Sequence, residues 1–516
     1  MDVPAALRSV PAGNAARLFE ATADRRGNRV AVEMNDRELS YADIGERAAA
    51  FAGGLRERGF EPGDRLLLYL PNCPEYVVTI LGALRAGVVV SPVNPQYKTR
   101  ELTHQLKDAD ARIAVTHPAL VDHLADACAE TNRDPTVVTV GETGDAVAFE
   151  DVTGEPVFVE RDADDTAMQP YTSGTTGRPK GVLVTHGNLR AQAYSGFQFT
   201  ERSPDEQREL AVLPLYHITG FVHSTWQALV RGGTVHLRNP ADWDADAVMR
   251  TIAEREITSF IGVAAMFVDM VNADSFGDRD LSSLDTVNEG GAKMPVAVQR
   301  AFEETAGVEM TEGYGLTETT AATHTGVGST FGAKHGSIGQ PLRMTDCKIV
   351  DDTGEEVRLG ETGELLVRGP QVMKGYHDRP DATDAAFTDD GYFRTGDVAR
   401  RDDDNYYEIV DRKKHMINTA GYNVYPSEVE ELLFEHPDVA DAGVVGIPDE
   451  RRNETVKAFV VRAPGSDLTA DEVREFCLSN LAEYKHPREV AFVDELPRTA
   501  SGKVQKFKLV EREADE

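Results

Sequence analysis

Short apolar segments alternate with amphipathic segments of helix length through most of the chain. Apolar runs at 65–70, 88–91 and 112–116 have the length of strands, and helical patterns at 76–86 and 100–107 lie between them. Parallel strands need a long crossover connection, usually a helix, so this alternation predicts a largely parallel sheet with helices on its faces. The same alternation continues further along the chain, with strands expected at 212–215, 234–237 and 258–263.

The pattern changes near Ser337, where short strand-like runs replace the longer alternation. The runs at 347–350 and 363–367 lie between turn-forming residues, which predicts a small β subdomain. A chain of 516 residues exceeds the size of one compact core, so more than one domain is expected. The predicted fold class is therefore α/β, with a large N-terminal domain of several subdomains and a small, mobile α+β C-terminal domain. The expected boundaries are 1–410 for the N-terminal domain, 411–414 for a hinge and 415–516 for the C-terminal domain.

The charge balance narrows the classes of partner. The chain has 87 acidic and 54 basic residues, with a formal net charge of −33. Such a surface repels nucleic acids and anionic membranes, so neither is an expected partner. The first lysine is Lys98 and arginines outnumber lysines, and an acidic, lysine-poor surface suits a protein kept soluble in concentrated salt. We therefore predict a cytoplasmic protein of a halophile, with an acidic enzyme of a mesophile as the alternative.

The cysteines and the apolar segments argue against export and against membrane insertion. The four cysteines are scattered without a C-x-x-C pair, which is typical of a reducing compartment and not of a disulfide framework or zinc site. The N-terminal residues lack a basic start followed by an apolar core, so no signal peptide is expected. The most apolar run, 77–90, contains Arg85 and two glycines, which indicates a buried helix and strand. The expected location is the cytoplasm, with no stable membrane insertion and with a homodimer left open.

One glycine-rich segment, YTSGTTGRPKGV at 171–182, combines the groups that bind phosphate. Glycines let the backbone approach a ligand, hydroxyls and backbone amides face phosphate oxygens, and a lysine adds a compact positive charge. The spacing differs from that of a Walker loop, because Pro179 beside Lys180 prevents the helix that follows such a loop. A surface loop between strands is the alternative interpretation. The candidate phosphate-binding residues are Thr172, Ser173, Gly174, Thr175, Thr176, Gly177 and Lys180.

Five further motifs follow this loop along the chain. With it they form an ordered set: YTSGTTGRPKG (171–181), LYHITG (215–220), GYGLTETT (313–320), YFRTGD (392–397), DRKKHMINTAGYNVYPSEVE (411–430) and PRTASGKVQK (497–506). This set resembles the adenylate-forming superfamily of acyl-CoA synthetases, adenylation domains and luciferases, over almost the whole length of the chain. The resemblance implies an ATP-dependent acid–CoA ligase with Mg²⁺ as cofactor. It would form acyl-AMP and pyrophosphate from a small-molecule carboxylic acid and ATP, and then pass the acyl group to CoA.

The resemblance also implies roles for single residues at the nucleotide. The glycine-rich segment would embrace the β- and γ-phosphates, while Thr175 and Glu318 would hold Mg²⁺ through hard oxygen ligands. Thr317 would contact the α-phosphate, and Asp397 would accept both ribose hydroxyls with Arg412 beside it. The remaining residues implied to line AMP, with Tyr314 stacked on the adenine, are Gly290, Gly291, Ala292, Glu312, Gly313, Tyr314 and Gly315.

Four more residues are implied in acyl transfer and domain movement. His217 would lie beside the acyl and thioester channel, and the Lys503 ammonium would stabilise the charge that builds at the α-phosphate and carboxylate. Lys414 would be a hinge, about which rotation brings Gly421 to the tunnel for the pantetheine thiol. Structural alternatives are a helix cap for Thr317 and Glu318, a turn for Asp397, a core position for His217, and solvated surface for Lys414.

The substrate is the least constrained part of the prediction. The string VNPQYKTRELTHQLKDADA at 93–111 most resembles fatty acyl-CoA synthetases, so a medium- or long-chain fatty acid is the first expectation. An aryl or branched acid, as for coumarate ligases, and loading of a carrier protein with the acyl group are the alternatives. A phosphotransferase, a non-catalytic binder and a luciferase-type oxygenase fit the motifs less well. Glu289 stands where the family often has Ser, and we expect its carboxylate to point away from the acyl pocket or to be paired.

Overall fold

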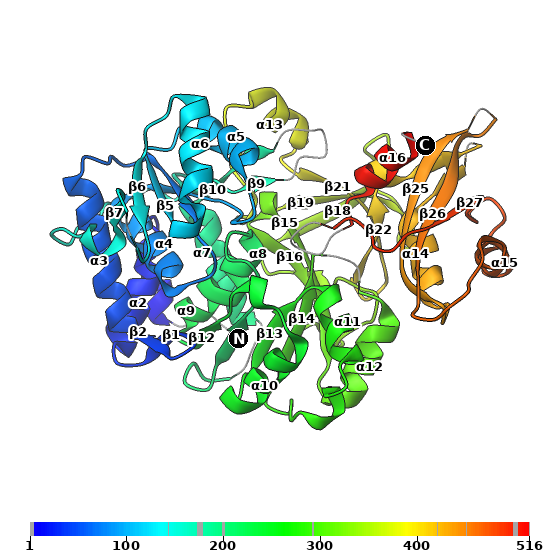
Figure 1. The fold of residues 1–516 in the computed structure, drawn as a ribbon, viewed down its shortest axis with the longest axis horizontal. Coiled ribbons are helices and arrows are strands. Elements are labelled where there is room, and N and C mark those ends of the chain that lie inside the picture. The colour runs from blue at the N-terminus through cyan, green and yellow to red at the C-terminus, as the bar shows by residue number, and fades with distance from the viewer. Residues whose placement is uncertain are drawn as a thin grey trace.

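The computed structural model describes residues 5–142, 144–172, 179–198, 202–291, 294–420, 422–449, 451–498 and 504–514. Within these residues the strands form two nine-stranded sheets, a four-stranded sheet and a five-stranded sheet (Figure 1). The two large sheets belong to the N-terminal part of the chain, and the α/β class expected from the alternation of strands and helices is confirmed. No helix of the described residues combines the length and the apolar character needed to cross a membrane.

The first large sheet has a parallel centre, with antiparallel strands added at both edges. Its parallel strands bring their carboxyl ends to one side, which is where ligands bind in open α/β sheets. In spatial order the strands are β17 (Gln340–Pro341), β16 (Ala321–Thr325), β15 (Met310–Leu316), β14 (Thr286–Gly290), β13 (Ser259–Gly262), β11 (Arg208–Ala211), β12 (Thr234–Leu237), β1 (Val30–Met34) and β2 (Arg37–Ser40).

The helices α10 (Ala245–Arg255), α11 (Ala264–Asn272) and α12 (Val296–Ala306) cover one face of this sheet (Figure 1). Their apolar side chains pack in one cluster with Leu210, Phe260 and Val287 of the strands. Side chains alternate between the two faces of a strand, so Glu209, Ser259 and Thr286 point to the opposite face. That opposite face is the one that the helical segment 218–231 approaches.

One strand was expected in the wrong place. The sequence predicted a strand at 212–215, but β11 ends at Ala211. Pro214 has no N–H to donate to a ladder, and the side chain of Asn72 instead satisfies the backbone on both sides of it. Its amide donates to the carbonyl of Leu213 at 2.9 Å and accepts from the N–H of Leu215 at 2.8 Å. The segment is apolar because it is buried, not because it is a strand.

The second large sheet carries the glycine-rich segment. Its strands β3 to β8 pair in parallel, whereas β10 pairs antiparallel to β8, β9 and β20. In spatial order the strands are β20 (Gly375–Tyr376), β10 (Lys180–Thr185), β8 (Thr166–Met168), β4 (Val89–Pro92), β3 (Arg65–Tyr69), β5 (Ile113–Thr116), β6 (Thr136–Thr139) and β7 (Val147–Ala148), with β9 (Tyr171–Thr172) beside β10.

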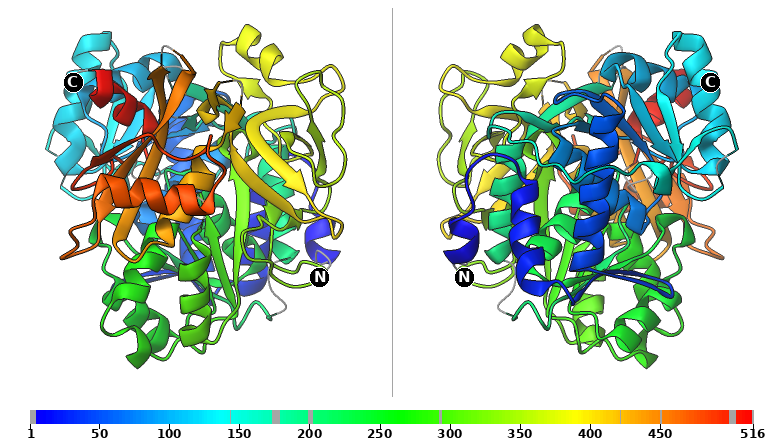
Figure 2. Two further views of the ribbon diagram at one scale, coloured as in Figure 1. Left: turned by 90° about the vertical axis from the view of Figure 1, so that its right-hand side faces the viewer. Right: turned by 90° about the vertical axis from the view of Figure 1, so that its left-hand side faces the viewer.

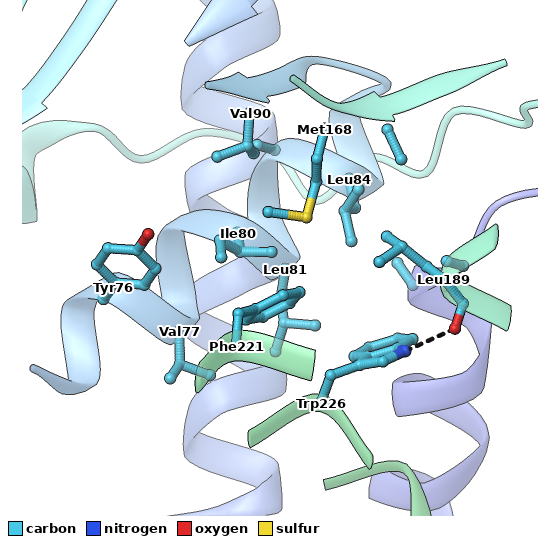
Figure 3. Close-up of a cluster of buried hydrophobic side chains, with 14 of the residues drawn as sticks. Tyr76, Val77, Ile80, Leu81, Leu84, Val90, Met168, Leu189, Phe221 and Trp226 are labelled. Carbon is cyan, nitrogen blue, oxygen red and sulfur yellow. Dashed lines mark hydrogen bonds between the residues drawn. The ribbon is translucent and has the colours of Figure 1, made fainter. Parts of the chain in front are cut away.

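One hydrophobic core joins the two large sheets (Figure 3). Helix α4 (Pro74–Ala86) lies at its centre and is buried along nearly its whole length, because apolar residues occupy every side of it. Met168 of β8, in the second sheet, and Trp226 of the helical segment 218–231, which packs against the first sheet, both contribute to it. The indole N–H of Trp226 donates to the carbonyl of Leu189 at 2.9 Å, which satisfies its one polar group inside the core.

The other N-terminal helices complete the layers around these sheets. They are α1 (Ala5–Arg8), α2 (Ala16–Arg26), α3 (Tyr41–Glu57), α5 (Thr99–Ala109), α6 (Val121–Thr131), α7 (His186–Ser195), α8 (Ile218–Phe221), α9 (Gln227–Arg231) and α13 (Pro380–Ala386). Helix α3 begins with a capping box in which Ser40 and Asp43 bond each other's backbone N–H groups, as its sequence indicates.

The C-terminal third of the chain contains the two smaller sheets. The small β subdomain is antiparallel and consists of β18 (Asp346–Val350), β19 (Gly363–Arg368), β21 (Phe393–Arg401) and β22 (Tyr407–Arg412). The five-stranded sheet follows it in the chain and faces the viewer in the left view of Figure 2. It contains β23 (Ile417–Thr419), β24 (Tyr422–Val424), β25 (Val439–Asp449), β26 (Asn453–Arg462) and β27 (Glu489–Phe492), with α14 (Pro426–Phe434), α15 (Ala470–Asn480) and α16 (Lys506–Ala514).

Candidate active site

A β-hairpin holds the two ends of the glycine-rich segment together. Thr172 at the end of β9 pairs with Lys180 at the start of β10, so the two ends of the segment lie side by side. The hydroxyl of Thr172 is buried and has no hydrogen-bond partner among the described residues. The ammonium of Lys180 lies 3.9 Å from the centre of the Tyr376 ring, in a cation–π contact. The predicted site residues that lie outside the described ranges are Ser173, Gly174, Thr175, Thr176, Gly177, Ala292, Gly421 and Lys503.

Tyr376 connects the hairpin to the predicted Mg²⁺ ligand. Glu318 lies in the 3-10 turn η7 (Thr317–Thr319) that follows β15, and the hydroxyl of Tyr376 donates to its Oε1 at 2.9 Å. Burial and the charge of Glu318 raise the pKa of Tyr376, so the phenol stays protonated and remains a donor. The N–H of Leu316 is capped at 2.8 Å by Thr319. Thr319 therefore caps this turn, and the carboxylate of Glu318 is not used as a cap.

Glycines at the ends of β14 and β15 form a rim without side chains. Gly290 pairs with Gly313 in parallel register, and the φ of Gly291 is +108°, a conformation that favours glycine. A Cβ atom on Gly290 would meet no atom closer than 3.8 Å, so the space above it is open. Gly315 is glycine for a different reason, because a Cβ atom there would lie 1.7 Å from the carbonyl oxygen of Ala321.

Two buried glutamates stand side by side behind this rim. Glu289 and Glu312 pair in the register of β14 and β15. Alternation along the strand places Glu289 on the opposite face from Asn288 and Gly290, which is the face covered by the outer helices. Glu289 is 1% exposed and has an interaction partner, so the expectation that it points away from the pocket or is paired is confirmed.

Asp397 joins the small β subdomain to the same rim. Its carboxylate is 2% exposed and accepts two bonds, from the Tyr314 hydroxyl at 2.5 Å and from Nε of Arg412 at 2.6 Å. Its own N–H donates to the hydroxyl of Thr395 at 3.0 Å. Asp397 lies within β21 and not in an ordinary turn. Two carboxylate oxygens offer about four lone pairs, so two further hydroxyl donors can still be accepted.

The phenol of Tyr314 is fixed in its neutral form. Burial and the neighbouring Asp397 charge both raise its pKa, so it donates to that carboxylate and keeps the tyrosine ring in one orientation. The ring lies edge-on to His324, with 5.9 Å between the ring centres. His324 is fully buried, and burial lowers its pKa to about 3, so it presents a neutral imidazole to Tyr314.

His217 lies at the start of a helical segment with a π-helical turn. Its Nδ1 accepts from the N–H of Thr219 at 3.3 Å, and so the imidazole caps α8. A Cβ atom on Gly220 would lie 2.2 Å from the carbonyl oxygen of Pro214, which fixes how the segment enters the helix. The π-helical turn η4 (Val222–Trp226) follows directly, and such turns are frequent at functional sites. His217 is therefore half-buried at a helix start, and not a core histidine.

The predicted hinge contains an anchored carboxylate. Lys414 is exposed and lies in the 3-10 turn η8 (Lys413–His415), directly after β22. Asp411, one residue before Arg412, is 5% exposed and accepts from both the N–H and the hydroxyl of Ser427, at 2.8 and 2.9 Å. Because Ser427 lies in the first turn of α14, Asp411 ties the end of the small β subdomain to the following domain.

Three residues that orient predicted site residues, or neighbours of these, were not themselves predicted from the sequence. Tyr376, Thr395 and Asp411 each hold a predicted site residue or its neighbour in place. Tyr376 lies 58 residues from Glu318 in the chain, so no local pattern indicates that the two meet. Thr395 and Asp411 both lie inside recognised strings. The string did not show that Thr395 binds the backbone of Asp397, and the bond from Asp411 to Ser427 depends on how two domains meet.

Comparison with known proteins places the whole chain in one family. The model of the AMP-binding enzyme family matches residues 19–377, and that of the AMP-binding enzyme C-terminal domain matches residues 428–503. A feruloyl-CoA synthase of an Amycolatopsis species is 37% identical over 507 residues, covering 98% of this chain and 99% of the relative. A long-chain-fatty-acid–CoA ligase of Yersinia pestis is 35% identical over 550 residues, covering 99% and 96%. The crystal structure of ATP-bound MatB from Rhodopseudomonas palustris has a TM-score of 0.90 and 30% identity, covering 97% and 99%.

Proposed function

The chain belongs to the AMP-binding enzyme family and is an adenylate-forming acid–CoA ligase, and on this premise we propose which of its residues handle each reactant. One observation carries the assignment: the segment 314–318 joins two polar clusters. At one end, the carboxylate of Asp397 accepts hydrogen bonds from both Tyr314 and Arg412. At the other end, Glu318 accepts a hydrogen bond from Tyr376. If a nucleotide lies along this segment, the cluster around Asp397 would bind its ribose and the cluster around Glu318 would bind its phosphates.

The nucleotide is assigned by the chemistry of these groups. Asp397 is an ionised acceptor with lone pairs to spare, so it receives the ribose hydroxyls. The open space above Gly290 leaves room for the flat adenine beside Tyr314. In this placement Thr317 contacts the α-phosphate. Lys180 and the buried hydroxyl of Thr172 contact the terminal phosphates.

The main difficulty of the reaction is the repulsion between the acid carboxylate and the phosphates of ATP, and the groups of this site reduce it. Preorganised donors and positive charges lower that repulsion without rearranging during the reaction. The Glu318 carboxylate, with one oxygen held by Tyr376, fits a hard cation and would hold Mg²⁺ together with Thr175. Bound there, Mg²⁺ would neutralise part of the phosphate charge.

The acid and CoA are assigned to the side of the site formed by His217 and the C-terminal domain. We assign His217 to the acyl channel because it caps the helix that borders the open face of the first sheet. The family resemblance assigns the catalytic charge to Lys503, the hinge to Lys414 and the CoA tunnel to Gly421. The bond between Asp411 and Ser427 supports a joint at this point, because it links the end of β22 to the first turn of α14. We place the reaction in the cytoplasm, which supplies ATP and CoA and suits four free cysteines.

Release of pyrophosphate by the purified protein tests this function directly. The assay contains ATP, Mg²⁺ and 2 M KCl, as suits the acidic surface, and is run with and without CoA across alkyl and aryl acids. We expect acid-dependent pyrophosphate release in both conditions and thioester only with CoA. The variant Asp397→Ala should lose most adenylation, because Arg412 loses its buried partner and the ribose its acceptor. Release of ADP or phosphate in place of AMP and pyrophosphate would contradict the proposal.

The acid itself is the open choice within this function. The sequence favoured a medium- or long-chain fatty acid, with an aryl or branched acid as the alternative. Relatives named for each class are similar to this chain to nearly the same degree, at 35% and 37% identity. Overall sequence identity therefore does not distinguish a fatty-acid substrate from an aryl-acid substrate. The residues that line the acid-binding side of the site determine that choice.

A further inference from the structure

Helix α5 lies next to the hairpin of β9 and β10 (Figure 1) and belongs to the string 93–111, to which the proposed function gives no role. Its polar residues His104 and Asp108 are four positions apart, so they share one face of the helix. Both side chains reach the hairpin, one at each end of the glycine-rich segment. The string therefore contacts the neighbours of the groups that we assign to the terminal phosphates.

Asp108 binds the first end of the segment. Its Oδ2 accepts from the hydroxyl of Tyr171 at 2.8 Å, and Tyr171 directly precedes Thr172. The Asp108 side chain is only 11% exposed, so water competes little for this bond. Burial and the charge of Asp108 both raise the pKa of Tyr171, so the phenol stays protonated and remains the donor.

His104 binds the second end. Its Nε2 lies 2.9 Å from the carbonyl oxygen of Pro179, which directly precedes Lys180. A carbonyl oxygen only accepts, so Nε2 carries the proton, in the neutral ring as in the charged one. The imidazole also lies edge-on to the ring of Tyr171, with 6.3 Å between the ring centres. His104 therefore contacts both sides of the hairpin.

The register of the hairpin brings these two attachments together. Tyr171 pairs with Gly181, and Thr172 pairs with Lys180. The amide nitrogen of Gln169 donates to the Tyr171 hydroxyl at 2.9 Å, and a Cβ atom on Gly181 would lie only 2.8 Å from that nitrogen. Glycine at this position therefore lets β10 pass close to the hydrogen bonds of Tyr171.

Helix α5 is itself held firmly against the second sheet. Leu102 and Leu106 are fully buried in the cluster that joins this helix to β3, β5 and α6. Gln105, which is 2% exposed, donates to the hydroxyl of Ser91 at 3.0 Å and to the carbonyl of Pro92 at 2.9 Å, at the end of β4. The helix is therefore a fixed support for the hairpin.

A third element joins this support at Asp108. Nη2 of Arg379 donates to Oδ1 of Asp108 at 2.9 Å, while Oδ2 takes the Tyr171 hydroxyl. Arg379 follows three residues after Tyr376, whose ring lies against the ammonium of Lys180. One carboxylate thus links the two segments that flank Lys180, which are the strand before it and the strand β20 beside it.

We propose that His104 and Asp108 are positioning residues for ATP, which fix the hairpin so that the Thr172 hydroxyl and the Lys180 ammonium meet the β- and γ-phosphates. The inference rests on the proposed function, because it assumes that these two groups bind the terminal phosphates. Such donors act by being in place before the reaction, and a misplacement of about 1 Å can cost about a hundredfold in rate. The role is independent of the acid that is activated.

The two half-reactions separate this role from a general structural one. In adenylation the acid carboxylate attacks the α-phosphorus and pyrophosphate leaves, so the β- and γ-phosphates of ATP have to be held. Transfer of the acyl group from acyl-AMP to CoA uses neither of these phosphates. A displaced hairpin should therefore slow the reaction of ATP and leave the reaction of acyl-AMP with CoA unchanged.

The variants His104→Leu and Asp108→Ala test the proposal in the full-length protein. We would measure pyrophosphate release from ATP, and thioester formation from chemically synthesised acyl-AMP and CoA, with the acid that reacts fastest. We expect kcat/KM for ATP to fall at least about tenfold, because the Thr172 and Lys180 groups lose their alignment. Thioester formation from acyl-AMP and the order of preference among acids should not change.

A conservative variant and two matched controls accompany this experiment. In His104→Gln the amide nitrogen can donate in place of Nε2, so most of the adenylation rate should return. His123→Leu and Asp126→Ala change the same residue types in the neighbouring helix α6, which packs on α5. These controls should alter neither half-reaction.

Several outcomes would overturn the inference. Equal losses in both half-reactions would mean that His104 and Asp108 only stabilise the fold, and an unchanged kcat/KM for ATP would mean that they do not position the hairpin. If either variant does not fold, Tyr171→Phe decides, because it removes only the hydroxyl that Asp108 binds and should also slow adenylation alone. The absence of pyrophosphate release by the unaltered protein with every acid would contradict the proposed function, whereas normal adenylation by the variants would contradict only this inference.

Discussion

Tyr376 shows how one side chain can serve two charged groups at once. Its hydroxyl bonds Glu318 at 2.9 Å, and its ring lies under the ammonium of Lys180, 3.9 Å away. The tyrosine therefore separates an anion and a cation that would otherwise collapse into an ion pair. Both groups stay directed at the space where we place the phosphates and Mg²⁺.

The variant Tyr376→Phe isolates the hydroxyl from the ring. It keeps the cation–π contact but leaves Glu318 without its donor, and a hydrogen bond to a charged group contributes roughly 1.5–3 kcal/mol. We expect the rate of pyrophosphate release to fall about tenfold and the Mg²⁺ concentration for half-maximal rate to rise. Steady-state assays across Mg²⁺ concentrations check this.

Tyr392→Phe is the matched control for that experiment. Tyr392 also donates to a carboxylate, Asp346, at 2.5 Å, but in the small β subdomain away from the proposed site. It should alter stability and not the Mg²⁺ dependence. Equal effects of the two variants on Mg²⁺ dependence would refute the orienting role of Tyr376.

At the scale of elements, the joint between β22 and α14 depends on one carboxylate. Burial would raise the pKa of Asp411, but His415, Lys506 and the N–H groups of Ser427 and Arg412 outweigh it and lower the pKa to about 2. Because the folded pKa lies below the unfolded value of about 3.9, the stabilisation is present above pH 4. It is lost as the pH falls from about 4 toward 2.

The pH dependence can be measured as the difference in stability between the unaltered protein and the variant Asp411→Asn. A pKa shift from about 3.9 to about 2 corresponds to about 2–3 kcal/mol of unfolding free energy at neutral pH. We expect the urea midpoint of the variant to lie below that of the unaltered protein at pH 6, and the gap to close toward pH 2. Asp467→Asn, at an exposed aspartate of the C-terminal domain, should give no such gap. A gap independent of pH would mean that Asp411 acts through packing alone.

At the scale of the whole molecule, the large net charge opposes the compact folded state through self-repulsion. A charge of −33 repels itself across the surface, and added salt shortens the screening length from about 10 Å at 0.1 M to about 3 Å at 1 M. We expect the thermal unfolding midpoint to rise with KCl, with most of the rise below about 1 M. Calorimetry in increasing KCl measures it, and a midpoint that does not change with salt would contradict the prediction of a halophile's protein.

Sequence patterns predicted those features that short segments determine for themselves. The alternation of strands and helices gave the α/β class, since each side-chain period depends only on neighbouring residues. The strand expected at 234–237 matches β12 (Thr234–Leu237). The same reasoning failed at 212–215, because the apolar residues there are buried without forming the hydrogen-bonded ladder of a strand.

The sequence by itself determined the family of this protein and its reaction, because ordered motifs carry that information locally, and it predicted which residues bind the nucleotide. Only the tertiary structure decided what holds those residues: Tyr376 on Glu318, Tyr314 and Arg412 on Asp397, and Ser427 on Asp411. It also decided that Gln207 and Glu209, at β11 of the first sheet, meet Arg231 of the facing helical segment. Their meeting depends on strand order and register between distant segments, for which no short stretch of sequence has a signal.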